Sequence, residues 1–79
     1  MKKLNEIDSR YWEVADIYQF NQLGDLYNVK TNRKIKTIDT TKGYSKRCML
    51  MKNNGINSSF GAYDINKAIH QYVAWNKVD

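Results

Sequence analysis

The sequence predicts a small α+β domain, in which an antiparallel sheet of short strands and hairpins packs against one C-terminal helix at about residues 64–77. Two patterns predict this fold. In the first part of the chain, turn-forming residues separate segments of strand length that are rich in aromatic and β-branched residues. In the last part, apolar residues recur with the period of an amphipathic helix. Proline is absent, so glycine, asparagine and threonine mark the turns.

The first predicted strand precedes a turn at residues 21–24. Its apolar side chains fall at even positions, as one face of a strand requires. They are Trp12, Val14, Tyr18 and Phe20. Gly24 can take the positive φ angle that a tight turn often needs. Tyr27 and Val29 then alternate with polar residues and predict a second strand, which ends at a turn at residues 31–32.

Two further strands are predicted before the helix. Lys34 and Lys36 would point the same way on a strand, opposite to Ile35. Residues 44–51 form two faces, neither of them wholly polar. One face holds Tyr44, Lys46, Cys48 and Leu50, and the other holds Ser45, Arg47, Met49 and Met51. The pair Asn54-Gly55 predicts a hairpin with a type I′ turn, because both residues tolerate the left-handed conformation.

The helix is predicted from apolar residues at the spacings i, i+3, i+4, i+7 and i+8. They are Ile65, Ala68, Ile69, Tyr72 and Val73. Asp64 precedes this stripe and is the expected N-cap, whose carboxylate would accept bonds from the first free amides. Lys77 suits the negative end of the helix dipole. We expect this helix to cover one face of the sheet and to leave the other face to basic residues.

Most aromatic residues are predicted to be structural. Six of them occupy patterned positions and are expected in the core: Trp12, Tyr18, Phe20, Tyr27, Phe60 and Tyr72. The patterns do not assign Tyr11 and Tyr44. Trp75 lies off the centre of the helical stripe, where either the edge of the core or an exposed anchor for a partner would fit, and the core is favoured.

Length and composition predict one domain, residues 1–79, in a reducing compartment. A chain of this length is near the lower limit at which a core suffices without covalent bracing, and the lone Cys48 cannot form an internal disulfide. Hydrophobic residues make up 42% of the chain, which is too many for intrinsic disorder. No apolar run approaches the roughly 18–20 residues of a membrane span, and none follows Met1 as in a secretory signal. We therefore expect no membrane partner and a cytoplasmic location in a bacterial host cell.

Basic residues are concentrated in one segment. Between residues 30 and 52, eight basic residues accompany one acidic residue, Asp39, so this segment has a formal charge of +7 while the whole chain has +5. Concentrated positive charge attracts polyanions, although a solvated face is the alternative. Arg33 and Arg47 are expected to read base edges, because a guanidinium can bind them bidentately. The residues expected to contact nucleic acid are Lys30, Arg33, Lys34, Lys36, Lys46 and Arg47.

Several short motifs occur in the order of a known module. They are the stretch Tyr18–Asn28, then Lys34-Ile35-Lys36, Gly43-Tyr44, the stretch Leu50–Gly55, and Phe60 leading into the helix. In this order they resemble a small module found beside HNH nuclease domains in phage homing endonucleases. The resemblance covers about residues 12–73 and implies a DNA-binding element that anchors a nuclease on its target. The nuclease part itself has no counterpart in this chain.

No catalytic or metal-binding constellation is predicted. His70 is the only histidine, and an HNH site needs further ligands around a metal and a histidine that activates water. Cys48 and His70 alone cannot bind zinc, and Cys48 is expected to be a packed thiol. Asp64 is expected to cap the helix. We therefore expect no enzyme, no cofactor and no small-molecule substrate.

Two functions remain after these exclusions. The first is a non-catalytic, phage-derived module that binds duplex DNA through a basic sheet surface within residues 30–52. The alternative is a small phage protein for host takeover, which would bind and inhibit a host protein such as RNA polymerase or a defence nuclease. A basic surface would also fit an acidic or nucleic-acid-binding groove on such a protein.

Overall fold

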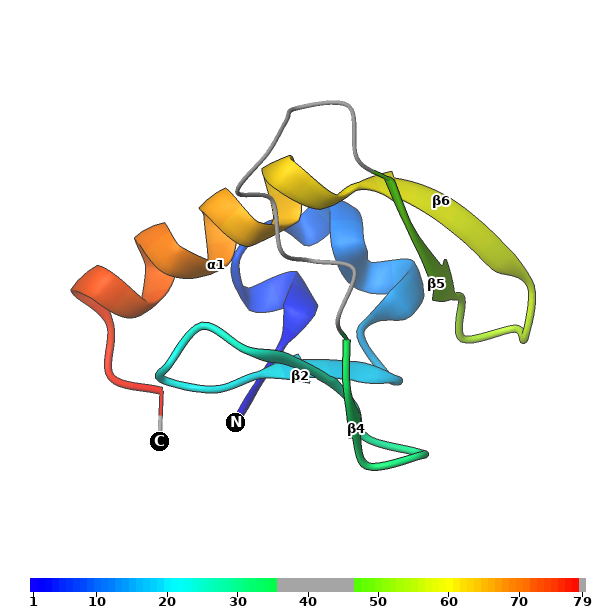
Figure 1. Cartoon of the computed structure of the whole chain (residues 1–79), viewed down its shortest axis with the longest axis horizontal. Helices are drawn as coiled ribbons and strands as arrows, with labels where there is room; N and C mark the ends of the chain where they lie inside the picture. The colour runs from blue at the N-terminus through cyan, green and yellow to red at the C-terminus, as the bar shows by residue number, and fades with distance from the viewer. Residues whose placement is uncertain (36–46, 79) are drawn as a thin grey trace.

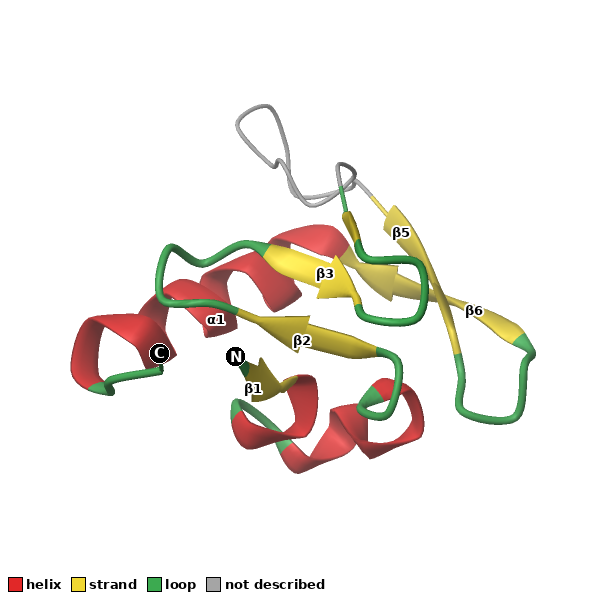
Figure 2. Cartoon of the chain, turned by 90° about the horizontal axis from the view of Figure 1, so that it is seen from below, coloured by secondary structure: helices red, strands yellow, loops and turns green. Residues whose placement is uncertain are grey.

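The computed structural model describes residues 1–35 and 47–78 of the chain. In these ranges it contains two antiparallel sheets, two short 3₁₀ helices and one C-terminal α-helix (Figures 1 and 2). The predicted fold class is therefore confirmed. The predictions for Lys36, Tyr44 and Lys46 fall outside the described residues.

The first sheet has four short strands in the order β1-β2-β3-β4, and all neighbouring strands are antiparallel. The strands are β1 (Lys2–Lys3), β2 (Tyr18–Phe20), β3 (Leu26–Asn28) and β4 (Arg33–Lys34). Gly24 in the β2–β3 turn has a φ angle of 87°, and its amide donates to the Asn21 carbonyl at 3.0 Å. Asn32 in the β3–β4 turn has a φ angle of 58°. Both turns lie where the sequence predicts them.

The segment before β2 is helical, so the prediction of a strand that begins at Trp12 is wrong. It forms the 3₁₀ helices η1 (Leu4–Glu6) and η2 (Ser9–Val14). The carboxylate of Asp8 starts η2 by accepting the amide of Arg10 at 2.9 Å. Buried side chains then recur every three residues, which is the period of a 3₁₀ helix rather than of a strand. They are Tyr11, Val14 and Ile17.

The second sheet is the hairpin of β5 (Arg47–Met51) and β6 (Asn57–Gly61). The hairpin was predicted, but its turn is not type I′, because Gly55 alone in this turn has a positive φ angle, 88°. The Gly55 amide donates to the Lys52 carbonyl at 2.8 Å, as in a type I turn followed by a glycine bulge. Cys48 and Leu50 are buried and their neighbours on β5 are exposed, which confirms the two predicted faces within this strand.

The α-helix, α1 (Ala62–Trp75), begins two residues before the predicted start, and Gly61 is its N-cap. Asp64 is not the cap; it lies in the first turn, near the positive end of the helix dipole. Lys77 lies beyond the helix, because Asn76 has extended backbone angles and binds the Tyr72 carbonyl through its amide and its side chain. None of the helices in the described ranges is long and apolar enough to cross a membrane.

The core lies between α1, η2 and the two sheets. Phe20 on β2, Leu50 on β5 and Ile65 on α1 are fully buried. Phe20 also meets Tyr72 edge-on, with ring centroids 5.5 Å apart and planes at 83°. The helix therefore packs on both sheets rather than on one face of a single sheet.

Both tryptophans were predicted to lie in the core, and both are exposed. Trp12 is 62% exposed and Trp75 is 88% exposed, although both were expected to be buried. Trp12 points out of η2, whose three-residue period turns its neighbours Tyr11 and Val14 inward instead. Trp75 follows Tyr72 and Val73, which already complete the apolar stripe. Of the other predicted core aromatics, Tyr18 and Phe20 are buried, while Tyr27, Phe60 and Tyr72 are half-buried.

Candidate nucleic-acid interface

The β3–β4 turn presents two exposed cations on a tightly built loop. The side-chain oxygen of Asn28 accepts the amides of Lys30 at 2.9 Å and Thr31 at 3.2 Å. The left-handed Asn32 then leads the chain into β4. Lys30 and Arg33 are exposed and form no ion pair with another described residue. We call residues 30–33 the basic turn.

Lys34 differs from the basic turn because its charge is partly offset. Its ammonium lies 3.2 Å from the Asp25 carboxylate, and its side chain is 53% exposed. Ile35 is half-buried and packs against the core, so this pair of residues has the opposed orientations that the sequence predicts. The other two predicted contacts in this region, Lys36 and Lys46, lie outside the described residues.

Arg47 lies at the opposite end of β5 from Lys52. It pairs with Gly61, at the start of α1, and its guanidinium donates to the Ser59 hydroxyl at 3.0 Å and to the Ser59 carbonyl at 3.2 Å. Lys52 is five residue steps along the chain from Arg47, a distance of about 16 Å in extended backbone. Figure 1 shows the start of β5 and the β3–β4 turn on opposite sides of the molecule, so Arg47 is not brought together with the basic turn.

Lys52, which was not among the predicted contacts, lies at the same end of the molecule as the basic turn. Ile17 and Tyr18 join the two: the Val29 amide donates to the Ile17 carbonyl at 2.8 Å, and the Met51 amide donates to the Tyr18 hydroxyl at 2.9 Å. Figures 1 and 2 both show the β3–β4 and β5–β6 turns at this end.

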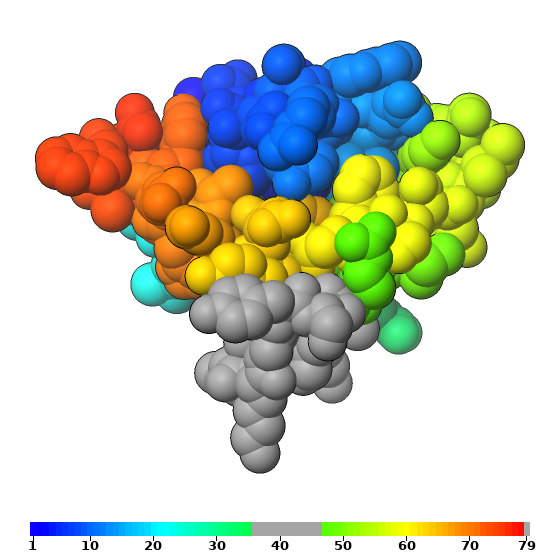
Figure 3. Space-filling view, turned by 90° about the horizontal axis from the view of Figure 1, so that it is seen from above, coloured from blue at the N-terminus to red at the C-terminus, as the bar shows by residue number. Residues whose placement is uncertain are grey.

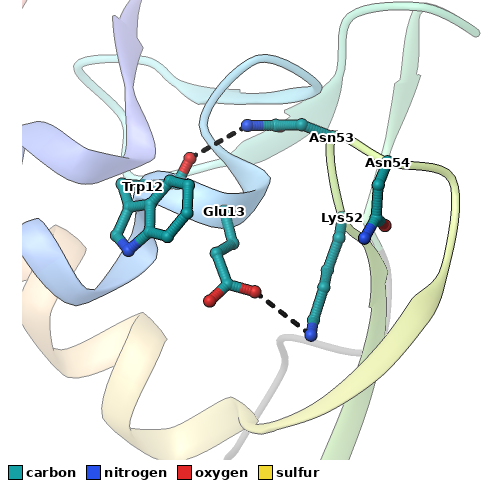
Figure 4. A pocket seen from close by; sticks show the side chains of 5 residues that line it. All are labelled: Trp12, Glu13, Lys52, Asn53 and Asn54. Atoms are coloured by element: carbon teal, nitrogen blue, oxygen red, sulfur yellow. Dashed lines mark hydrogen bonds and ion pairs between the residues drawn. The ribbon is translucent and has the colours of Figure 1, made fainter.

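A slot opens beside Lys52, between η2 and the tip of the β5–β6 hairpin (Figure 4). Its volume is about 210 Å³. The Lys52 ammonium lies 3.1 Å from the Glu13 carboxylate, so the two charges in the slot are paired with each other. The lining residues are Trp12, Glu13, Lys52, Asn53 and Asn54.

Three hydrogen bonds hold the hairpin tip on η2, and all involve Asn53. Its amide donates to the Glu13 carbonyl at 2.6 Å, and its side-chain nitrogen donates to the Trp12 carbonyl at 3.0 Å. Its side-chain oxygen accepts the Asp16 amide at 3.2 Å. The walls of the slot are thus joined to each other. The sequence predicted this turn, but it gives no local signal that the turn packs on η2.

Outside the slot, the pKa shifts of the titratable groups come from burial or from a neighbouring side chain. Burial raises the pKa of the Cys48 thiol and of the Tyr11 hydroxyl, so both are held neutral. The hydrogen bond from the Arg10 side chain lowers the pKa of Asp8. His70 is exposed, and its ring lies directly over Gly24. Among the described residues, no three histidine, cysteine, aspartate or glutamate side chains come together as a metal site.

No family model, curated protein or solved structure matches this chain. The resemblance to the module of phage HNH endonucleases therefore stays a prediction. The functional argument rests on the basic turn and the slot themselves.

The raised pKa values of Cys48 and Tyr11 predict a loss of stability in alkali. Both groups ionise more easily in the unfolded chain, so their contribution is complete below the unfolded pKa and is lost as pH rises toward the folded pKa. We expect the free energy of unfolding to fall above about pH 8.5, where a free thiol ionises, and again near about pH 10, where a free tyrosine does. Urea unfolding at a series of pH values across this range measures the free energy of unfolding. Cys48→Ala should remove the first step and Tyr11→Phe the second; an unchanged profile in both variants would contradict the assignment.

Proposed function

We propose that the protein is a non-catalytic DNA-binding module that contacts the phosphates of duplex DNA through its basic turn and the adjoining basic residues of the segment 30–52. The observation that carries this proposal is the pair Lys30 and Arg33. Both side chains are exposed on a hydrogen-bonded turn, and neither charge is neutralised by another described residue. By contrast, Lys34 and Lys52 each have a carboxylate partner.

Electrostatics supports this assignment over a merely solvated surface. A protein that neutralises phosphates gains affinity from released counterions, and unpaired cations contribute most because they give up no internal partner. The segment's formal charge of +7 would also raise the rate of encounter with a polyanion. The charges have a second use, since basic residues on an edge strand such as β4 discourage pairing with another chain. The experiment below separates these two roles.

The test is charge reversal on the basic turn. With about four to six phosphates neutralised, log affinity for duplex DNA should fall against log salt with a slope of roughly −4 to −5. In Lys30→Glu/Arg33→Glu this slope should become shallower by about 2, and affinity at low salt should fall on the order of tenfold or more. Fluorescence anisotropy with a labelled duplex measures both quantities.

The matched control is Lys67→Glu/Lys77→Glu, which makes the same change in net charge on exposed residues of the C-terminal region. It should change the salt slope far less than the reversal on the basic turn. Equal losses in the two variants would mean that only net charge matters. Unchanged DNA binding in Lys30→Glu/Arg33→Glu would leave the turn with the edge-protecting role and would remove the DNA-binding proposal.

A second candidate function, binding to a protein partner, is favoured by exposed apolar residues at the opposite end of the molecule from the β5–β6 turn (Figure 1). Leu23 is 77% exposed and Trp75 is 88% exposed. The Gln22 side chain brings their segments together by donating to the Val73 carbonyl at 2.9 Å. Figure 3 shows the last turns of α1, in orange and red, projecting at one end of the molecule. Exposed tryptophans are common anchors in protein interfaces. A partner captured from bacterial lysate that survives nuclease treatment, and is lost in Trp75→Ala, would favour this function.

A further inference from the structure

The slot between η2 and the β5–β6 turn has the size of a site for one ring. Figure 4 shows the indole of Trp12 on one side, Lys52 and Asn54 on the other, and Glu13 between them. A cavity of about 150 Å³ accommodates a benzene ring, whereas sites for drug-sized ligands begin at about 300 Å³. The slot, at about 210 Å³, lies between these sizes.

The indole of Trp12 is available to a ligand. The ring is 62% exposed, so the core does not use most of its surface. The hydrogen bond between Trp12 and Asn53 uses the backbone carbonyl of Trp12 rather than its ring. Because Asn53 also binds Glu13 and Asp16, the opposite wall is already in place, and a ligand would not need to order it.

The charges around the slot favour a neutral ring with polar edges. A cation on the indole would lie beside the Lys52 ammonium, and an anion would lie beside the Glu13 carboxylate, since these groups are 3.1 Å apart. A neutral heteroaromatic ring avoids both repulsions. Its amino groups could donate to Glu13, and its acceptors could face the amide nitrogen of Asn54, whose side-chain oxygen already accepts the Ile56 amide at 3.0 Å.

We propose that this slot stacks one unpaired nucleobase on Trp12, so that the module prefers nucleic acid in which a single-stranded stretch adjoins a duplex. This inference rests on the proposed DNA binding. The slot and the basic turn lie at the same end of the molecule, so a strand whose phosphates contact Lys30 and Arg33 could place a neighbouring base in the slot (Figures 1 and 2). A paired base could not enter, because its faces are covered by the stack.

The test compares a duplex that contains a short single-stranded gap with the same duplex intact. Base–aromatic stacking is worth about 1–3 kcal/mol, so Trp12→Ala should weaken binding to the gapped duplex roughly 5- to 100-fold. Its binding to the intact duplex should stay within about twofold of the wild type. Trp12→Phe should restore part of the preference, because it keeps an aromatic face. Trp75→Ala is the matched control and should change neither affinity, since the end of α1 lies at the opposite end of the molecule from the β5–β6 turn (Figure 1).

Fluorescence provides a direct readout of the slot. In Trp75→Phe, Trp12 is the only tryptophan, so its emission should be quenched when a short oligothymidine or oligoadenosine binds. Absence of quenching, or an undiminished gap preference in Trp12→Ala, would overturn the nucleobase site. Quenching by argininamide but by neither oligonucleotide would also overturn it and would indicate a site for cationic side chains. The charge reversal on the basic turn is measured on intact duplex, so failure of the DNA-binding proposal is seen separately.

Discussion

Phe20→Ala is expected to lower the free energy of unfolding by about 3–5 kcal/mol, the cost of removing a large aromatic side chain from a packed core. Phe20 is fully buried on β2, which lies inside the first sheet between β1 and β3. The substitution also removes the edge-on contact with Tyr72, and such contacts contribute about 0.5–1.5 kcal/mol beyond area burial. Urea unfolding followed by circular dichroism measures the change.

This loss is large for a chain of 79 residues. At about 0.05–0.15 kcal/mol per residue, the whole domain is stable by only about 4–12 kcal/mol. Trp75→Ala removes an aromatic ring of similar or larger size from an 88% exposed position and should cost within about 0.5 kcal/mol. If the two variants lost similar stability, β2 and α1 would not share the core described above.

Gly24→Ala is expected to cost about 2–5 kcal/mol, and Gly55→Ala only about 1–2 kcal/mol, although both glycines have nearly the same φ angle, 87° and 88°. An added Cβ at Gly55 would meet no atom within 4 Å, so its cost is the left-handed backbone alone. An added Cβ at Gly24 would overlap the ring of His70. The difference between the two variants therefore measures the displacement of His70 from the β2–β3 turn.

A double-mutant cycle with His70→Ala checks this cause. In the His70→Ala background, Gly24→Ala should cost about as much as Gly55→Ala, because the nearest atoms that an added Cβ would meet at Gly24 belong to the removed imidazole. Thermal or urea unfolding of the four proteins gives the interaction energy. If Gly24→Ala stayed more costly without the imidazole, the extra loss would come from the turn itself and not from its contact with α1.

Local periodicity predicted the helix and the alternation of β5, because in these segments the buried face repeats regularly along the chain, whereas the turn residues Asn54-Gly55 predicted the hairpin. It failed before Tyr18, where Trp12 and Val14 matched the two-residue period of a strand by coincidence. The three-residue spacing of Tyr11, Val14 and Ile17 was also present in the sequence and is the correct period. Because the segment is short, Val14 fits both the two-residue and the three-residue period. The burial of Tyr11 shows that the three-residue period is the correct one.

The candidate site was only partly predictable for a different reason. The positions of Lys30 and Arg33 follow from a turn that the sequence encodes locally. The separation of Arg47 from them, and the meeting of Trp12 with Lys52, depend on how η2 and the β5–β6 hairpin pack, and this packing brings together residues about forty positions apart in the chain. Counting charges in the sequence identifies the basic segment, but it does not show which lysines, such as Lys34 and Lys52, have a carboxylate partner in the fold.

Both ends of the chain are attached to the same short stretch. β1 pairs with Gln19 and Phe20, and the Val78 amide donates to the Gln22 side chain at 2.7 Å. Figures 1 and 2 accordingly place the N-terminus beside the segment that follows α1 and ends at Val78. A mechanical force applied between the termini would therefore first load the two-residue strand β1 and the buried Val78 with its hydrogen bond to Gln22. Such a force should separate β1 from β2 and Val78 from Gln22 first, while β2 to β6 and most of α1 stay folded.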